Sequence, residues 1–192
     1  MADQGEGSRA EVAAGVSRKR EPIRLHLGGT APREGWKILD IQARPGVDYV
    51  GNVMDLSMFE DNSVIEVYAS HVYEHLDYQT EIRKALKEAH RVLKPGGLLR
   101  AGVPNLEVLS RLFVKPGVDL QQRIHIMRMM FGGQIDFTDY HRIGLSFDIF
   151  SMFLMEAGFK NIRQVDQFDL FDDCTKIRFM GVSISLNVIA IK

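Results

Sequence analysis

The segment 64–103 constrains the fold of this chain more than any other part of it. An apolar run at 64–69 is followed by residues 77–93, in which apolar side chains recur at three- and four-residue steps, as on one face of a helix. Lys94-Pro95-Gly96-Gly97 ends this helix, because proline cannot continue the hydrogen-bond ladder and glycine tolerates a left-handed exit. A second apolar run, 98–103, comes directly afterwards. The order strand, helix, strand predicts a right-handed, parallel βαβ unit.

The rest of the chain supplies further strands for the same sheet. They are bounded by turn residues and lie at 23–27, 37–41, 48–50, 162–165 and 182–191. Runs this apolar are typical of a parallel sheet that is covered on both faces. The sequence therefore predicts an α/β fold.

Two more helices are predicted in the second half of the chain. The first covers 119–131, and its inner face is expected to carry Leu120, Ile124, Met127 and Phe131. The second covers 147–157, with Ser146 as its N-cap and Gly158 as its stop.

Composition and charge favour one domain without a nucleic-acid or membrane partner. A length of 192 residues suits a single hydrophobic core. The 24 Lys and Arg residues balance 25 Asp and Glu residues, so no overall field attracts nucleic acid or anionic lipid. No apolar run approaches the roughly 18 to 20 residues that span a bilayer. With a single cysteine, Cys174, these features predict a cytoplasmic protein, with a flexible tail at 1–21 and a domain at 22–192.

The residues that follow the first three strands are candidates for binding a ligand, because an open parallel sheet binds ligands at the carboxyl ends of its strands. Gly28 and Gly29 follow the first strand and allow a ligand to approach the backbone, although a plain tight turn would need them equally. Asp40 ends the second strand and could accept hydrogen bonds from ribose hydroxyls, or be a solvated carboxylate. Asp55 and Leu56 follow the third strand and could face an adenine ring, or Asp55 could cap a turn.

The exit of the fourth strand, residues 70–76, combines two histidines with a glutamate. This spacing is compatible with metal ligands. With a single carboxylate and no companion cysteine, however, we predict no metal site there. A polar loop whose groups satisfy one another is the alternative.

Two consecutive motifs resemble those of a known family. VYASHVYEHL at 67–76 and ALKEAHRVLKPGGLLRAGVP at 85–104 resemble the fourth strand, the following helix and the fifth strand of class I S-adenosylmethionine-dependent methyltransferases. The chain is most similar to methyltransferase type 11 domains with an abbreviated N-terminal part. The resemblance extends over 23–192 and implies a Rossmann-like, seven-stranded, mostly parallel sheet. Its implied order is 3-2-1-4-5-7-6, with an antiparallel last strand.

The resemblance also implies a cofactor, S-adenosylmethionine, and residues that would surround it. Gly28 and Gly29 would border its methionine part, Asp40 its ribose, and Asp55 with Leu56 its adenine. Ser70 and His71 would line the pocket near the sulfonium.

The chain departs from the family's usual pattern near its N-terminal end. The first motif is LHLGGT, with His26 where the family has an acidic residue. The links between the first three strands are too short for the helical crossover of a dozen or more residues that parallel neighbours usually need. The first helices are therefore expected to be shortened or missing. Residues 1–21 or a partner chain, as in a homodimer, would then cover that face.

An insert at about 105–145 would form the acceptor side of the pocket, or a dimer contact. Within it Asp139, Tyr140 and Arg142, together with His75 from the strand exit, are candidate substrate-binding residues. His141 and His71 are the candidate catalytic bases, because imidazole titrates near neutral pH.

Three functions follow from these observations. The first is methyl transfer to an oxygen or nitrogen of a small-molecule acceptor. The second is a catalytically silent methyltransferase-like binding or scaffold subunit, which the reduced glycine motif favours. The third, RNA methylation, would need a basic face that the balanced charge does not supply.

Overall fold

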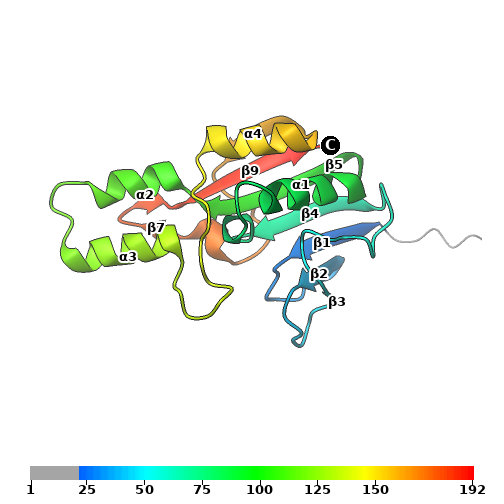
Figure 1. The fold of residues 1–192 in the computed structure, drawn as a ribbon, viewed down its shortest axis with the longest axis horizontal. Helices are drawn as coiled ribbons and strands as arrows, with labels where there is room; N and C mark the ends of the chain where they lie inside the picture. Colours follow the sequence, from blue (N-terminus) through cyan, green and yellow to red (C-terminus); the bar gives the residue numbers. More distant parts are fainter. Residues whose placement is uncertain (1–21) are drawn as a thin grey trace, which may run out of the picture.

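The computed structural model describes residues 22–192, so the predicted flexible tail lies outside the described residues. A seven-stranded sheet in the order β3-β2-β1-β4-β5-β9-β6 forms the centre of the molecule (Figure 1). Its strands are β1 (Ile23–Leu27), β2 (Trp36–Asp40), β3 (Tyr49–Val50), β4 (Val64–Ser70), β5 (Leu93–Pro104), β6 (Lys160–Val165) and β9 (Ser185–Ile191).

The sheet has the predicted topology, because β6 and β9 stand for the sixth and seventh strands of the expected order. Every pair is parallel except the two that involve β9, which runs antiparallel to β5 and β6. The predicted fold class is thereby confirmed.

The βαβ unit predicted at 64–103 is present as β4, α1 (Glu81–Val92) and β5. The helix begins four residues after the predicted start at Asp77, because the Asp77 carboxylate accepts hydrogen bonds from the backbone of Gln79 and Thr80 and forms a turn ahead of it. Its apolar side, including Leu86, is buried with Phe150 of α4 (Phe147–Ala157) and Val67 of β4. Helices α1 and α4 therefore cover the same face of the sheet (Figure 1).

The opposite face carries a cluster of aromatic side chains. Trp36 and Tyr68 of the sheet pack against Phe168 and Phe171, which belong to the connection between β6 and the short helix η2 (Cys174–Lys176). The links from β1 to β2 and from β2 to β3 contain no helix, as predicted. Among the described residues, the connection 166–173 covers Trp36 and Tyr68 on this face, and the cover expected from the tail or from a partner chain stays a prediction.

The insert forms a pair of helices at one end of the sheet, α2 (Leu106–Phe113), which was not predicted, and α3 (Leu120–Phe131) (Figure 1). Asp119 caps α3 through a capping box with Gln122. The predicted inner face of α3 is wrong. Its four residues are exposed, with relative accessibilities of 72% for Leu120, 44% for Ile124, 44% for Met127 and 56% for Phe131.

The reason for this error is that α3 packs on α2 rather than on the sheet. It does so through Ile126, which is fully buried with Leu109 of α2. A helix in a projecting pair has only one covered side, and the apolar pattern alone does not reveal which side that is.

The homodimer that the sequence suggests as an alternative role for the insert stays a prediction.

Two smaller predictions need correction near the C-terminal end. The strand expected at 182–191 is divided into β8 (Val182–Ser183), which pairs with β7 (Arg178–Phe179), and β9. The α4 helix has its predicted bounds and ends at Gly158 in a left-handed conformation, but the Ser146 hydroxyl bonds to Asp148 instead of capping the backbone. No helix among residues 22–192 is long and apolar enough to cross a membrane.

Candidate functional site

A cavity of about 670 Å³ lies at the carboxyl ends of β1, β2 and β4. Its walls come from the turn after β1, the loop after β2, residues 51–54 after β3, the exit of β4 and the end of the insert. This is the edge at which a parallel sheet binds its ligands, and the volume lies within the range of about 300 to 1,000 Å³ that is usual for small-molecule sites.

The turn after β1 needs both of its glycines, for different reasons. Gly28 lines the cavity with a φ of +67°, and a Cβ atom there would lie 2.7 Å from Val72. Gly29 does not line the cavity, and a Cβ atom there would lie 2.6 Å from the His26 ring. Gly28 therefore allows a left-handed turn at the cavity wall that packs on Val72, whereas Gly29 lets the turn pack on His26.

Asp40 lines the cavity, and its carboxylate is held in place by neighbours from its own loop. One oxygen accepts a 2.7 Å hydrogen bond from the backbone of Gln42, and the other accepts a 2.8 Å bond from Arg44. Arg44 also donates to the Gly29 carbonyl over 2.6 Å, so it ties the glycine turn to Asp40. Arg44 was not among the residues predicted from the sequence. Each carboxylate oxygen can accept a further hydrogen bond.

Asp55 and Leu56 do not line the cavity. The Asp55 carboxylate is in solvent and accepts a 3.1 Å bond from the backbone of Ser57, and hydrogen bonds from Ser57 lower its pKa. Leu56 is fully buried in the core. The residues of this loop that line the cavity come slightly earlier, at 51–54, and include Asn52 and Met54.

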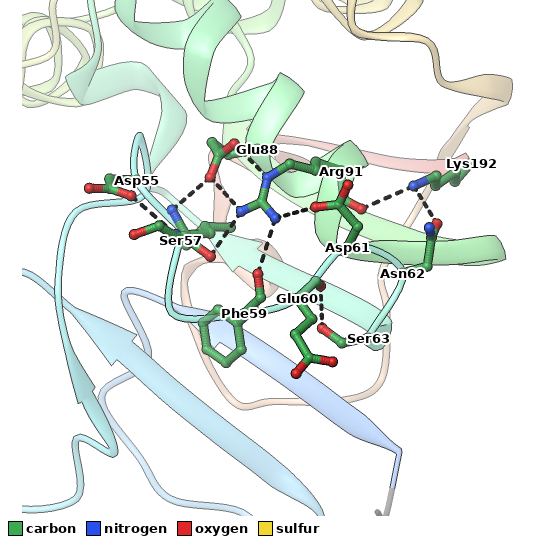
Figure 2. Close-up of polar contacts among 11 residues, drawn as sticks. Asp55, Ser57, Phe59, Glu60, Asp61, Asn62, Ser63, Glu88, Arg91 and Lys192 are labelled. Atoms are coloured by element: carbon green, nitrogen blue, oxygen red, sulfur yellow. Dashed lines mark hydrogen bonds and ion pairs between the residues drawn. The ribbon is translucent and has the colours of Figure 1, made fainter.

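A network of charged side chains from α1 fixes the loop 55–63, as Figure 2 shows. Arg91 donates to the carbonyl oxygens of Leu56 and Phe59 over 3.0 and 3.1 Å. Glu88 accepts from Arg91 and, over 2.8 Å, from the backbone of Leu56. The hydrogen bonds from Arg91 are the main cause that lowers the pKa of Glu88. By anchoring the loop that follows residues 51–54, this network helps to hold them at the cavity.

His71 lines the cavity at the exit of β4, in a left-handed conformation with a φ of 53°. Its Nε2 lies 3.0 Å from the Ser185 hydroxyl, which itself donates to the Cys174 carbonyl, so Nε2 is the protonated nitrogen. Burial lowers the pKa of His71 to about 4, and the ring is neutral at neutral pH. Ser70 does not line the cavity and interacts with Asp173 instead.

Glu74 lies in the short helix η1 (Tyr73–His75) with 1% of its surface exposed. Burial raises the pKa of its carboxyl group to about 8. Among the described residues neither carboxylate oxygen has a hydrogen-bond partner, and the His71 Nδ1 atom lies 3.3 Å from Oε1. The sequence signal for Glu74 was its place between two histidines.

The end of the insert lies against this helix. His75 Nδ1 lies 3.1 Å from the Tyr140 carbonyl, and the His75 and His141 rings are 5.0 Å apart in an edge-on arrangement. His75, Tyr140 and Arg142 line the cavity, whereas His141 lies behind His75. Burial and the neighbouring His75 lower the pKa of His141.

The remaining insert candidates have structural partners. Arg142 forms ion pairs with Glu81 and, at 3.6 Å, with Asp77. Asp139 does not line the cavity, and its carboxylate accepts a 3.3 Å bond from the backbone of Ile135. The structure thus brings Gly28, Asp40, His71, His75, Tyr140 and Arg142 around one cavity, and places Gly29, Asp55, Leu56, Ser70, Asp139 and His141 outside its lining.

Residues 35–101 match the family described as methyltransferase domain. The match covers less than half of the chain and includes β2, β4, α1 and most of β5. The predicted resemblance is confirmed in the segment that carries the quoted motifs. No curated relative matches the chain.

Solved structures share the fold of most of this chain at low sequence identity. A SAM-dependent methyltransferase from Archaeoglobus fulgidus is 15% identical, with a TM-score of 0.56 over 89% of this chain and 86% of that one. A possible exported protein from Bordetella parapertussis is 12% identical, with a TM-score of 0.54 over 88% of this chain, which spans only 61% of that protein. Human N-acetylserotonin methyltransferase in complex with SAM is 15% identical, with a TM-score of 0.52 over 89% of this chain and 47% of that one.

Proposed function

We propose that this methyltransferase-type domain binds S-adenosylmethionine and transfers its methyl group to an oxygen or nitrogen of a small-molecule acceptor in the cytoplasm. One observation carries the proposal. The cavity at the strand ends joins Gly28 and Asp40 on one side to His71 and His75 on the other, in a chain whose segment 35–101 matches methyltransferase domains.

The donor side of the cavity suits the cofactor. Gly28 leaves the backbone open to a close approach, and Asp40 has free lone pairs for ribose hydroxyls. Asn52 and Met54 would flank the adenine, in place of Asp55 and Leu56. When bound, the sulfonium supplies an electrophilic methyl group.

The acceptor side is polar and almost neutral in charge. Tyr140 and His75 line it, and the charge of Arg142 is balanced by its pairs with Glu81 and Asp77. A wall of this kind suits a small acceptor with hydrogen-bonding groups and gives no basic path for a nucleic acid.

The chain's own contribution to the reaction would be positioning and proton removal. Holding the acceptor within about 3 to 3.5 Å of the methyl carbon removes much of the entropic barrier. His71 is on the cavity and is our first candidate to take the acceptor's proton, through Nδ1, because its Nε2 hydrogen is donated to Ser185. This Nδ1 lies 3.3 Å from Glu74 Oε1 and would have to exchange that neighbour for the acceptor, whereas His141 would act through His75. His75, Tyr140 and Arg142 would orient the acceptor.

A titration with S-adenosylhomocysteine tests the proposal. Binding should raise the melting temperature, because a ligand present at about a hundredfold excess over its Kd stabilises the folded state by roughly 2.7 kcal/mol. A melting temperature that stays constant up to millimolar ligand would contradict it.

The scaffold function is the second candidate, and the donor side favours it in two details. His26 replaces the family's acidic residue and is buried against Phe171. Arg44 already holds one oxygen of Asp40. If the titration shows no binding, the silent subunit becomes the better explanation.

A further inference from the structure

We propose that Glu74, His75 and His141 bind one divalent transition-metal ion, such as Zn²⁺, at the acceptor end of the cavity. One ring nitrogen of each histidine and one oxygen of Glu74 all lie within 4.8 Å of one another. No metal site is predicted from the sequence, because the exit of β4 offers a single carboxylate and no companion cysteine, and His141 is brought beside it only by the fold.

The hydrogen bonds of the two histidines decide which nitrogen can bind a metal. His75 Nδ1 lies 3.1 Å from the Tyr140 carbonyl, and His141 Nδ1 lies 3.1 Å from the Met129 carbonyl. A carbonyl oxygen only accepts, so both Nδ1 atoms carry the hydrogen. In each neutral ring Nε2 is then the atom with a free lone pair. Metal-binding histidines are usually oriented in this way, by a carbonyl or carboxylate on the second nitrogen.

Glu74 adds a buried carboxylate with no donor to satisfy it. It is 1% exposed, and among the described residues neither of its oxygens accepts a hydrogen bond. The nearest ring atom, His71 Nδ1 at 3.3 Å, is also without a hydrogen, since His71 donates through Nε2 to Ser185. The nearest ring nitrogen therefore offers the carboxylate no hydrogen. An unpaired buried carboxylate is costly, and either a proton or a metal cation bound among these groups would remove the cost.

The backbone holds these groups together before any ion binds. The Glu74 carbonyl accepts hydrogen bonds from the backbone of Arg142 at 2.8 Å and Ile143 at 3.3 Å. The backbone N–H of His141 donates to the Phe131 carbonyl over 3.1 Å. Arg142 and Ile143 thus attach the insert to η1 directly after His141, and the bond to Phe131 ties His141 to the end of α3, so the site needs only small side-chain movements to close on an ion.

Two imidazoles and one carboxylate favour Zn²⁺ or a similar first-row ion over Mg²⁺ or Ca²⁺, which prefer oxygen ligands. Three protein ligands leave a coordination position open, as in catalytic zinc sites. Because His75 lines the cavity, that position would be reached by the acceptor. This part of the inference rests on the proposed function. The acceptors would be small molecules with a hydroxyl group, because a bound metal ion makes the hydroxyl proton easier to remove.

The test measures metal binding without any methyl transfer. The chain is treated with a chelator, exchanged into Zn²⁺, dialysed, and analysed for metal content, with Mg²⁺ as a comparison. The variants are Glu74→Gln, His75→Ala and His141→Ala, and the matched control is His125→Ala, because His125 lies on α3 beside Phe179 and outside the cluster. We expect one retained equivalent of Zn²⁺ in the parent and the control. Each ligand variant should bind more than about tenfold more weakly.

Co²⁺ substitution of the parent gives a measurement that does not depend on variants folding. The visible bands of a four- or five-coordinate Co²⁺ site are expected. The proposal is overturned if these bands are absent and no Zn²⁺ is retained. It is equally overturned if Zn²⁺ is retained but the three substitutions do not weaken its binding. In either case a proton bound to the Glu74 carboxylate would explain how the buried group is stabilised. S-adenosylhomocysteine is titrated separately. Zn²⁺ retention without S-adenosylhomocysteine binding would refute the proposed function while leaving the metal site supported.

Discussion

Replacing Asp40 with alanine tests the donor side of the cavity. The carboxylate side chain is 12% exposed, lines the cavity and has lone pairs left for ribose hydroxyls. Hydrogen bonds to a charged group contribute about 1.5 to 3 kcal/mol, and every 1.4 kcal/mol changes Kd tenfold. Asp40→Ala should therefore weaken S-adenosylhomocysteine binding by about tenfold to somewhat more than a hundredfold.

The same substitution should leave the fold intact. Arg44 loses its pair with Asp40 but keeps the 2.6 Å hydrogen bond to the Gly29 carbonyl. The pair is partly exposed, with 28% of the Arg44 side chain accessible, so solvent screening limits its contribution to about 1 kcal/mol or less. That corresponds to a melting temperature lower by no more than about 2 to 4 °C.

Asp55→Ala is the matched control, because Asp55 follows the next strand and lies outside the cavity. Isothermal titration calorimetry of the parent and both variants with S-adenosylhomocysteine makes the comparison. We expect Asp55→Ala to bind as the parent does. The reasoning is refuted if Asp40→Ala also keeps the parental Kd, or if Asp55→Ala loses as much affinity as Asp40→Ala.

Three further predictions concern stability. Arg91→Ala should lower the free energy of unfolding by about 1 to 3 kcal/mol in denaturant titrations, because it removes the hydrogen bonds to the carbonyl oxygens of Leu56 and Phe59 in the loop 55–63. Arg91 lowers the folded-state pKa of Glu88, so the stability that this carboxylate contributes is present above its unfolded pKa of about 4.3 and is lost as the pH falls through the lower folded value. The difference between the parent and Glu88→Gln should then shrink in acid unfolding curves, and a difference that grows would contradict the sign. Ile124→Gln on the exposed side of α3 should change stability by less than about 0.5 kcal/mol, whereas Ile126→Ala should cost about 2 to 5 kcal/mol in the same assay.

The sheet was predictable because each strand is recognisable from its own local sequence. Leu25, Val67 and Leu99 belong to runs of apolar residues that are buried in one core, and such runs are recognisable without knowing their partners. The α3 helix shows the limit of this reasoning. Its apolar residues occur on two sides, and only the position of α2 decides that Ile126 is buried and Ile124 exposed.

Candidate residues at the very end of a strand line the cavity more often than candidates farther along the loops, and the roles of all of them stay predictions. Asp40 is the last residue of β2 and lies on the cavity. Beyond the two-residue strand β3, the loop turns away from the cavity within a few residues. Asn52 therefore lines the cavity, whereas Leu56 is drawn into the core beneath it. Arg44 was missed because nothing in its local pattern shows that it reaches back to Gly29.

The two halves of the cavity are joined by few contacts, and this bears on how the acceptor is chosen. The donor residues lie at the carboxyl ends of β1, β2 and β3, whereas the insert meets η1 mainly through the Glu74 carbonyl and His75. Exchanges within 105–145 that preserve these contacts would change the acceptor wall without moving Asp40. A change at Glu74, by contrast, would act where the two halves meet, because its backbone carbonyl holds the insert and its carboxylate faces His71. A substitution of its side chain should alter the contact with His71 and leave the backbone bonds to the insert in place.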